Sequence, residues 1–514
     1  MQSPQRRNVL EVLQEQASRR PDRPAVITAD AVISYGELAK SATKAAAALA
    51  AQGLGRGDRL GLLSDNRLEW LELFFGAAAR GVCVAPFSTW STLAELEFLL
   101  ADSEVSTLYT LERYGDRAFL DGVQRLVDAG RLPNLKRINA IGAPYAPWGG
   151  ATDAAAEPDD WLALLYTSGS SNRPKSVPLL HFAAIENGFN IGERQGLTDQ
   201  DRVLISIPLF WSYGAVNALM ATLTHGAALV LQPRFEPGGA LDLIENRRCT
   251  AIYTLPAMTN ALLAHPAFTR ERTASLRTGV TIGAPQDVIR AAEELGVQNI
   301  CNVYGQTEGY GNCCVTPNNW PLQRRAACQG LPLPGVSIRI RDLETGAEKA
   351  AGDIGEIEVA GYLTPGYAGQ SATHNVDAFT DDGFFRTGDL GALLPDGSLS
   401  FAGRRSEMIK RSGINVSPAE VEEALQTSDE VGLAGVAGAP DPDKGEIIVG
   451  FVVLRPGVKI EQDELRARCR KLLSSYKLPD RIFFRDALPL TPTGKLMRRE
   501  LAELARAAVQ EQTQ

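Results

Sequence analysis

The chain has 514 residues and a mass of 55.3 kDa, which is long enough for several domains with large hydrophobic cores. Hydrophobic residues make up 44% and charged residues 22%, an ordinary globular composition that excludes a disordered or low-complexity chain. The 52 basic and 61 acidic side chains give a formal net charge of −9, so we expect no nucleic-acid partner.

The cysteines and the N-terminus indicate the cellular compartment. The seven cysteines are scattered, odd in number and free of C-x-x-C spacing, so we expect reduced thiols and no zinc or redox motif. The first 20 residues lack a continuous apolar core, and no stretch approaches 18 uncharged apolar residues. These features predict a cytoplasmic protein with no export signal and no membrane span.

From about residue 25 to 300, short apolar runs alternate with segments of helical period. This alternation is typical of helices that cross over between the strands of a largely parallel sheet. Ser34 and Glu37 form a capping box ahead of an apolar helix face that ends at Gly53, and Thr92 with Glu95 repeats the pattern. The pattern therefore predicts an α/β fold for this part of the chain.

Between residues 330 and 402 the period changes to two. Val336, Ile338 and Ile340 alternate with polar residues, and a Pro-Asp-Gly turn at 395–397 separates two further apolar runs. We expect a small antiparallel sheet or β-barrel here.

A third region begins near residue 404. Ser417, Pro418 and Glu420 place an N-cap, a first-turn proline and a capping-box acid before a predicted helix, and an apolar strand at 447–454 follows. This part has 18 Lys plus Arg against 17 Asp plus Glu, unlike the acidic remainder. Both features favour a separate C-terminal domain.

Residues 161–176 combine an apolar strand with a loop of glycine and hydroxyl residues that follows it. The loop ends in Lys175. Backbone N–H groups, hydroxyls and an ammonium in one loop suit a polyphosphate. The spacing from Gly169 to Ser176 is that of a P-loop, except that Pro174 replaces the second glycine. Proline has no N–H to donate, so a P-loop nest cannot form, and an ordinary surface loop is the alternative.

The segment YTSGSSNRPKSV at 166–177 resembles the signature loop of the adenylate-forming enzymes, the superfamily of acyl-CoA synthetases, luciferases and peptide-synthetase adenylation domains. Four further resemblances follow in the family's order, over about residues 10–505. They are Ile282–Pro285 with Val303–Glu308, Phe385–Asp389, Gly403–Gly413 and Pro489–Lys495.

The resemblance implies a fold and a domain organisation. A large N-terminal domain, 1–402, would contain two doubly wound α/β subdomains and a small β-barrel. A hinge at 403–406 would join it to a small mobile α+β domain at 407–514 that acts as a lid.

The resemblance also implies residue roles. Tyr304 would stack on adenine, Thr307 would contact the α-phosphate, Glu308 would hold Mg²⁺, Asp389 would accept both ribose hydroxyls, and Lys495 would act in adenylation. The catalytic set is Lys495, Thr307 and Glu308; Ser406 is the hinge residue, and Gly413 lies in the thiol tunnel. The ATP and AMP site would comprise Thr167, Ser168, Gly169, Ser170, Ser171, Lys175, Gly283, Ala284, Tyr304, Thr307, Asp389 and Arg404.

The acid pocket is predicted around the FWSYG segment at 210–214. Its expected residues are Trp211, Ser212, Tyr213, Ile282, Gly309 and Tyr310. Trp211 stands where many relatives carry histidine and where α-amino-acid adenylation domains carry aspartate. Trp211 offers no anion for an ammonium, which favours a neutral aromatic or aliphatic acid. An aromatic core cluster is the alternative interpretation of FWSYG.

The predicted function is ATP-dependent activation of a small-molecule carboxylic acid to acyl-AMP, with release of pyrophosphate, followed by thioester formation with coenzyme A. ATP, Mg²⁺ and coenzyme A are the implied cofactors. One alternative acceptor is an acyl carrier protein. The cations at 466–471 could meet either acceptor or form a solvated helix face; they are Arg466, Arg468, Arg470 and Lys471.

A third possibility is a nucleotide-binding pseudoenzyme with little turnover. Asn172 and Ser176 occupy positions that are usually glycine in the signature loop. Asn tolerates a left-handed backbone, whereas Ser176 puts the mobility of the loop in doubt.

Overall fold

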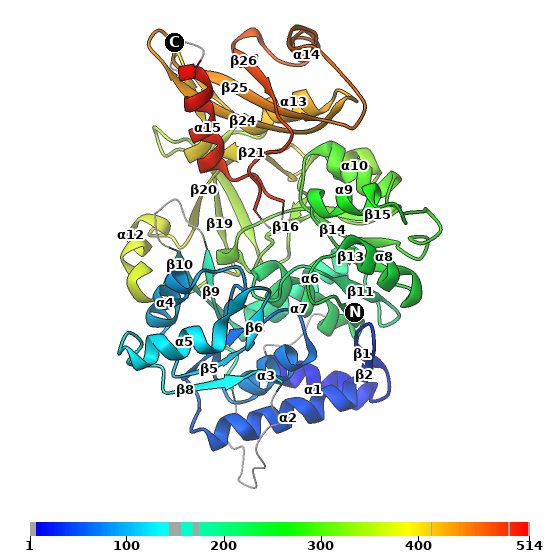
Figure 1. Ribbon diagram of the computed structural model, residues 1–514, viewed down its shortest axis with the longest axis vertical. Coiled ribbons are helices and arrows are strands. Elements are labelled where there is room, and N and C mark those ends of the chain that lie inside the picture. The colour runs from blue at the N-terminus through cyan, green and yellow to red at the C-terminus, as the bar shows by residue number, and fades with distance from the viewer. Residues whose placement is uncertain (1–6, 143–155, 168–173, 413, 492–493, 512–514) are drawn as a thin grey trace.

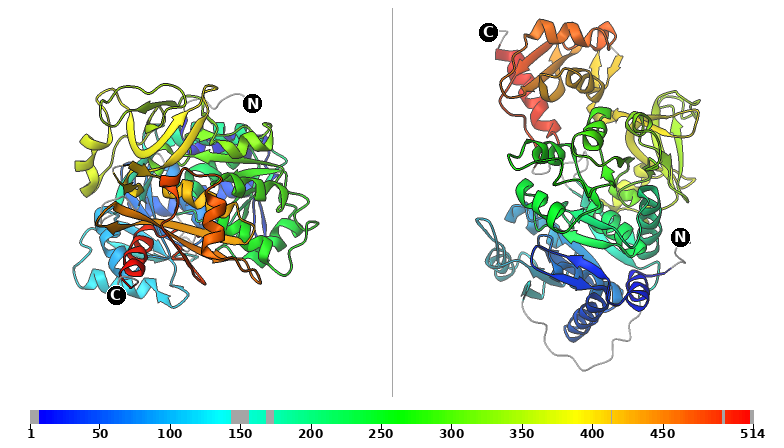
Figure 2. Two further views of the ribbon diagram at one scale, coloured as in Figure 1. Left: turned by 90° about the horizontal axis from the view of Figure 1, so that it is seen from above. Right: turned by 90° about the vertical axis from the view of Figure 1, so that its right-hand side faces the viewer.

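The computed structural model describes residues 7–142, 156–167, 174–412, 414–491 and 494–511. The molecule is elongated, and the segment from about residue 407 stacks on one end of a larger body (Figure 1). The right-hand view in Figure 2 shows the same segment, coloured orange and red, above the α/β layers. No helix among the described residues is long and apolar enough to cross a membrane.

The larger of the two mainly parallel sheets in the body has nine strands in the order β17-β16-β15-β14-β13-β11-β12-β1-β2. Six central strands, from β15 to β1 in this order, are parallel to one another. The outer strands β2, β16 and β17 each pair antiparallel with the neighbouring strand. The bounds are β1 Pro24–Ile27, β2 Val32–Ser34, β11 Arg202–Ile205, β12 Ala228–Leu231, β13 Ala251–Tyr253, β14 Thr278–Thr281, β15 Asn299–Tyr304, β16 Cys314–Val315 and β17 Leu331–Pro332.

The second sheet has six strands in the order β10-β9-β4-β3-β5-β8, and only β10 is antiparallel to its neighbour. Its strands are β3 Arg59–Leu63, β4 Cys83–Phe87, β5 Thr107–Thr110, β8 Arg137–Ala140, β9 Trp161–Thr167 and β10 Lys175–Leu180; a short hairpin, β6 Arg113–Tyr114 and β7 Arg117–Ala118, lies outside it. Parallel strands in both sheets confirm the predicted doubly wound α/β body.

Helices connect the strands and bury apolar faces against the sheets. The predicted capping boxes Ser34–Glu37 and Thr92–Glu95 are both formed, and they start α2 and α4. The helices of the body are α1 Val9–Arg19, α2 Tyr35–Ala51, α3 Leu68–Ala79, α4 Leu93–Asp102, α5 Phe119–Asp128, α6 His181–Gln195, α7 Leu219–His225, α8 Pro237–Asn246, α9 Pro256–Ala264, α10 Pro285–Glu293, α11 Leu322–Ala327 and α12 Asn375–Ala378.

The region of period two forms a four-stranded antiparallel sheet, β18-β19-β20-β21. Of the two expected forms, an antiparallel sheet and a barrel, the structure therefore shows the sheet. Its strands are β18 Ser337–Arg341, β19 Gly355–Ala360, β20 Phe385–Leu393 and β21 Leu399–Arg404. The last two strands bring Asp389 opposite Arg404 in register, which places both side chains at the cavity described below.

The C-terminal part is α+β, as predicted. Its sheet pairs β23-β22-β25-β24, with β26 parallel to β25. Its elements are β22 Ile409–Arg411, β23 Ile414–Val416, α13 Pro418–Gln426, β24 Val431–Asp441, β25 Gly445–Leu454, α14 Gln462–Cys469, β26 Arg481–Phe484 and α15 Arg498–Glu511. Ser417 precedes α13, but its hydroxyl donates to the Ala402 carbonyl at 2.6 Å instead of capping the helix.

The hydrophobic cores divide along the chain. Two clusters of buried residues draw their members only from 409–482 and from 437–508, whereas the other clusters use residues 9–399. Each part therefore buries its own apolar surface, which is what two folding units need in order to move relative to each other.

Candidate active site

A cavity of about 1110 Å³ lies between the body and the C-terminal part. Ser88 and Trp90 follow β4, Thr167 ends β9, and Thr307 follows β15, so the cavity opens at the carboxyl ends of strands from both sheets. This edge is where α/β proteins bind ligands. The four-stranded sheet adds Asp389 and Arg404, and the C-terminal loop adds Thr491 and Lys495.

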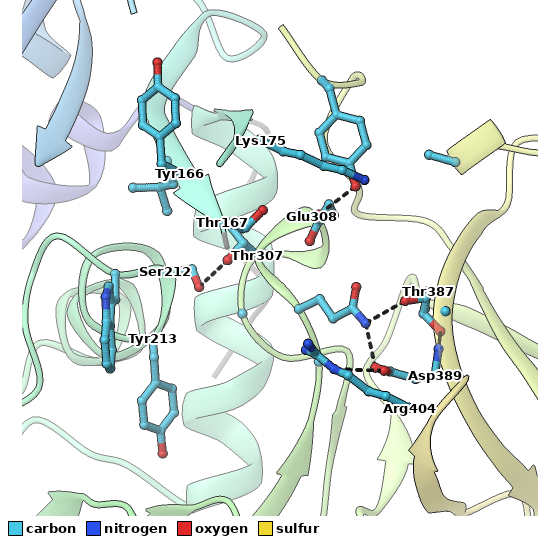
Figure 3. Close-up of a pocket in the computed structure, with 18 of the residues that line it drawn as sticks. Tyr166, Thr167, Lys175, Ser212, Tyr213, Thr307, Glu308, Thr387, Asp389 and Arg404 are labelled. Carbon is cyan, nitrogen blue, oxygen red and sulfur yellow. Dashed lines mark hydrogen bonds and ion pairs between the residues drawn. The ribbon is translucent and has the colours of Figure 1, made fainter. Parts of the chain in front are cut away.

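One wall of the cavity holds a lysine, a tyrosine and a glutamate in contact. The Tyr367 hydroxyl donates to Glu308 Oε1 at 2.8 Å, and Lys175 Nζ lies 4.7 Å from the centre of the Tyr367 ring. Burial raises the pKa of Glu308, and its backbone hydrogen bond, Tyr367, Lys175 and Arg404 only partly oppose this. The carboxylate is therefore held where a cation would stabilise it (Figure 3).

A second cluster surrounds Asp389. Its Oδ2 accepts from the Tyr304 hydroxyl at 2.9 Å and from Gln306 Nε2 at 2.6 Å, while Arg404 Nε lies 3.4 Å from Oδ1. Oδ1 itself has no hydrogen-bond donor in the described part of the chain. Burial raises the pKa of Asp389 against the opposing effects of Arg404, Gln306 and Tyr304. Figure 3 shows Asp389 beside Arg404 and Thr387. A carboxylate at the edge of the cavity is a suitable acceptor for the hydroxyls of a ribose.

The C-terminal loop delivers Lys495 into the same cavity. Lys495 Nζ lies 5.8 Å from the centre of the Trp211 ring, within the range of a cation–π contact. Gly494 has φ = 78°, and a Cβ there would lie 1.9 Å from that of Ala257 in α9, so only glycine lets the loop approach the body so closely. Burial in the cavity and the charge of Arg404 lower the pKa of Lys495.

Aromatic side chains form the opposite side of the cavity. Trp90 packs edge to face against Phe210 and Trp211, with ring centres 5.2 and 5.3 Å apart. The Ser212 and Thr307 hydroxyls lie 3.1 Å apart and join this wall to the phosphate side (Figure 3). A smaller cavity of about 180 Å³ lies next to the same three aromatic residues. The arrangement suits a flat or apolar acid beside a polar nucleotide.

Most predicted site residues lie together in this cavity. Its lining includes Thr167, Lys175, Trp211, Ser212, Tyr213, Ile282, Thr307, Glu308, Asp389, Arg404, Ser406 and Lys495. Ser168, Gly169, Ser170, Ser171 and Gly413 lie outside the described residues.

Five predicted residues do not line the cavity: Gly283, Ala284, Tyr304, Gly309 and Tyr310. Tyr304 packs beside Phe401, with ring centres 5.7 Å apart, and acts on the cavity through its bond to Asp389. Tyr310 is fully buried in the core, where its hydroxyl accepts from the Leu180 N–H at 2.9 Å. The backbone of Tyr310 is left-handed, with φ = 60°. The pattern of apolar residues in the sequence does not reveal such a conformation, so the burial of this side chain in the core was not predicted.

Several lining residues were absent from the sequence prediction. Gln306, inside the YGQTE motif, bridges the Thr387 carbonyl at 3.0 Å and Asp389. Trp90 follows the end of β4, a position where a site residue could have been expected from the strand order. Tyr367 carried no signal in the sequence, because its contact with Glu308 joins residues 59 positions apart.

Ser176 is accommodated without strain. It lies in β10, is buried, and donates from its hydroxyl to the Ala368 carbonyl at 2.6 Å. Its N–H faces the Ser371 hydroxyl at 3.3 Å, and its φ is not positive. The serine therefore replaces the conformational freedom of glycine with a bond that holds the end of the loop against residues 368–371.

The cations at 466–471 do not form one free cluster. Arg468 is bound to Glu430, at 2.7 Å, and to Glu464, at 2.8 Å. Both partners of Arg468 belong to the C-terminal part. These ion pairs favour the interpretation as a solvated helix face over that of a binding site for the acceptor.

The comparisons with known proteins agree with this geometry. Residues 13–368 match the model of the AMP-binding enzyme family, and residues 420–495 match that of the AMP-binding enzyme C-terminal domain. The acyl-CoA ligase SID4 of Ajellomyces capsulatus is 31% identical over 98% of this chain and 92% of its own.

Solved structures show the same likeness. The crystal structure of ATP-bound MatB from Rhodopseudomonas palustris has a TM-score of 0.85 at 28% identity, covering 97% of this chain and 99% of that one. The anthranilate CoA ligase AuaEII in complex with anthranoyl-AMP has a TM-score of 0.89 at 26% identity and covers 98% of both chains. With its motifs, cavity and full-length matches, the chain belongs to the AMP-binding enzyme family of the adenylate-forming superfamily.

Proposed function

We propose that this protein is an AMP-forming carboxylate–CoA ligase whose cavity carries out both half-reactions. The observation that carries the proposal is the meeting of Lys495 from the C-terminal loop with Lys175, Glu308 and Asp389 of the body in one cavity. Groups that neutralise phosphate charge and a carboxylate that can accept ribose hydroxyls thus lie beside an aromatic pocket for an acid.

In the first half-reaction, a carboxylate oxygen of the acid attacks the α-phosphorus of ATP. The bond from that phosphorus to the bridging oxygen breaks, and pyrophosphate leaves with the electron pair. Two anions must approach each other, so positive charge and alignment dominate catalysis. We assign Lys495 and the Thr307 hydroxyl to the charge that develops at the α-phosphate, and Lys175 to the leaving pyrophosphate.

The acyl-CoA synthetases of this family use ATP, Mg²⁺ and coenzyme A. The described residues offer no cluster of three metal-binding side chains, but Mg²⁺ in nucleotide sites needs only one or two carboxylates with the substrate phosphates. Glu308 fits that need, because its pKa is raised by burial and a cation would relieve the cost of its charge. When bound there, Mg²⁺ would supply positive charge to the phosphates.

In the second half-reaction, the thiol sulfur of coenzyme A attacks the acyl carbon of the acyl-adenylate. The bond from that carbon to the AMP oxygen breaks, AMP leaves with the electron pair, and the thiol proton passes to solvent. We propose that residues 407–514 rotate as a lid about a hinge at 403–406, relative to a body of 1–402. Exposed Ser406 in the turn after β21 is the hinge residue we assign, and rotation would withdraw Lys495.

Coenzyme A is the acceptor we propose. The related acyl-CoA ligase and anthranilate CoA ligase are named for this acceptor. The identity of the acid differs among the relatives and does not transfer to this chain.

Pyrophosphate release tests the function. We expect release that depends on the acid, from a panel of aryl and short, medium and long aliphatic acids, and thioester only when coenzyme A is added. Competition between coenzyme A and a purified acyl carrier protein separates the acceptors. Binding of ATP without release for any acid would indicate the pseudoenzyme instead.

The aromatic wall yields a prediction of its own. Replacing Trp211 with alanine removes one face of the pocket and the cation–π partner of Lys495. We expect the preferred acid to shift toward larger chains or rings, with kcat/KM for the best wild-type acid about 10- to 100-fold lower. Exchange of pyrophosphate into ATP across the panel measures this, and an unchanged profile would place Trp211 in the core instead.

A further inference from the structure

The serine that follows Lys175 ties the start of β10 to a distant part of the chain. Ser176 is 1% exposed, and hydrogen bonds join it to residues 368–371. Its hydroxyl donates to the Ala368 carbonyl at 2.6 Å, its carbonyl accepts from the Ala368 N–H at 3.0 Å, and its N–H donates to the Ser371 hydroxyl at 3.3 Å. Successive side chains of a strand point to opposite faces, so Lys175 lines the cavity while Ser176 faces this segment.

A buried carboxylate ties the neighbouring strand β9 to the same segment. Asp102 is 6% exposed and is the last residue of α4. Its Oδ2 accepts from the Tyr166 hydroxyl in β9 at 2.9 Å, and its Oδ1 accepts from the Gln370 N–H at 3.0 Å. A carboxylate is unfavourable at the C-terminal end of a helix, and these two donors offset that cost. A Cβ at Gly369, where φ is 55°, would lie 2.8 Å from Oδ1, so the close approach requires glycine.

These contacts close a ring around the two strands. Tyr166 and Ser176 are paired in the antiparallel register of β9 and β10. Residues 368–371 bind Ser176 directly, and they bind Tyr166 through the carboxylate of Asp102. We call Asp102 together with residues 368–371 the clamp. It holds both strands at the point where they reach the cavity, because Tyr166 and Lys175 line that cavity.

The clamp bears on the position of the Lys175 ammonium. A lysine carries its charge on a flexible four-carbon stem, so the charge stays in one place only where the backbone and the contacts of the stem are fixed. Lys175 Nζ lies 4.7 Å from the centre of the ring of Tyr367, the residue before Ala368. One segment therefore holds both the strand that carries Lys175 and the ring that its ammonium contacts.

We propose that Ser176 and Asp102 are positioning residues that fix Lys175 where it meets the terminal phosphates of ATP. Neither residue lines the cavity, so both act through the lysine. The inference rests on the proposed function, which assigns Lys175 to the leaving pyrophosphate. Binding of ATP should therefore depend on the clamp, whereas binding of AMP, which lacks the β- and γ-phosphates, should not.

Calorimetric titration with ATP and with AMP, in the absence of an acid, tests the proposal. Because it removes one buried hydrogen bond, Ser176→Ala should raise Kd for ATP by about 3- to 10-fold. Asp102→Ala should raise it by about 10- to 100-fold, because the lost bonds are to a charged group. Kd for AMP should change by less than about twofold, because AMP does not reach the separate site at Lys175. KM for pyrophosphate in ATP–pyrophosphate exchange should rise with Kd for ATP, while KM for the acid stays unchanged.

A double-mutant cycle with Lys175→Ala separates positioning from general damage. If the clamp acts through this lysine, Ser176→Ala should add less than about twofold to the loss that Lys175→Ala causes alone. Thr273→Val is the control variant. Thr273 is 0% exposed and its hydroxyl donates to the Leu295 carbonyl at 2.8 Å, but it does not line the cavity. This variant should leave Kd for both nucleotides unchanged.

Three results would each overturn the proposal: an unchanged Kd for ATP in Ser176→Ala, equal losses for ATP and AMP, or full additivity with Lys175→Ala. If Asp102→Ala does not fold, Ser176→Ala and its cycle decide the outcome. Failure of every acid to support pyrophosphate exchange would refute the proposed function, whereas the two dissociation constants would still test the clamp. The two failures are therefore distinguishable.

Discussion

Replacing Lys495 with alanine is expected to lower acyl-adenylate formation by about 10²- to 10³-fold, the typical cost of removing one group that stabilises transition-state charge. Lys495 is the cation that the C-terminal loop brings into the cavity, 5.8 Å from the centre of the Trp211 ring. Thioester formation from supplied acyl-adenylate should stay within about threefold of wild type, because the α-phosphate bond has already formed. Stopped-flow or quench measurement of each half-reaction checks this.

The control for this experiment is Lys459→Ala, which removes an exposed lysine from the same C-terminal part. It should leave both half-reactions unchanged. Equal losses in both half-reactions for Lys495→Ala would contradict the assignment, because a general disturbance of the lid would act on both.

The same lysine sets a pH dependence. Burial and the Arg404 charge lower the pKa of Lys495, so its ammonium loses its proton at a lower pH than an ordinary lysine does. The adenylation rate should therefore fall as pH rises through this lowered pKa, while the second half-reaction does not follow it. Lys495→Arg should keep its charge and move the alkaline limb upward, whatever its absolute rate.

Replacing Asp389 with asparagine is expected to raise KM for ATP by about 10- to 100-fold, with a smaller effect on kcat. Asp389 Oδ2 accepts from Tyr304 and Gln306, and Arg404 Nε lies 3.4 Å from Oδ1, so the carboxylate is the acceptor that we assign to the ribose once Arg404 moves aside. The asparagine side chain has no charge and presents only one oxygen to the ribose. The loss of charge-assisted hydrogen bonds costs about 1.5–3 kcal/mol of binding free energy. Steady-state kinetics with ATP as the varied substrate measure the change.

Folding stability separates this effect from unfolding. Burial raises the pKa of Asp389, so its charge destabilises the fold above that pKa, and removing the charge at neutral pH should not lower Tm. Asp381→Asn, on the exposed turn before β20, should leave KM for ATP unchanged. An unchanged KM in Asp389→Asn would exclude the carboxylate as the ribose acceptor.

Local signals in the sequence predicted the elements well. The capping boxes at Ser34 and Thr92 start helices because they involve neighbours three residues apart, which a sequence shows directly. The strand β10 was missed: the loop was expected to end at Lys175 and no strand was predicted directly after it, although Lys175–Leu180 pairs antiparallel with β9 over six residues. That pairing depends on the register between two segments, and an apolar run does not reveal a register.

The site was predictable where it lies in contiguous motifs. Thr307, Asp389 and Lys495 stand in recognisable segments, and the fold brings them to one cavity. Contacts between distant segments were not predictable. The bond of Tyr367 to Glu308 and the inward turn of Tyr310 depend on tertiary packing and backbone conformation, which have no periodic signature.

The structure shows how the chain accommodates Ser176. A serine at a family glycine position suggested an impaired phosphate loop. Its hydroxyl bond to Ala368 shows that the chain has replaced flexibility at this point with a fixed anchor. Asn172, the other departure from the family pattern, lies outside the described residues, so pyrophosphate release is the test of the pseudoenzyme alternative.

Single-turnover detection of the acyl-adenylate tests the central claim most directly. The enzyme, ATP, Mg²⁺ and an acid that supports pyrophosphate release are mixed without coenzyme A, and the products are identified by mass spectrometry. The two half-reactions predict that acyl-AMP accumulates on the enzyme and is converted to acyl-CoA and AMP when coenzyme A is added. Formation of acyl-CoA with no acyl-AMP in the first stage, or release of ADP and phosphate, would contradict the account.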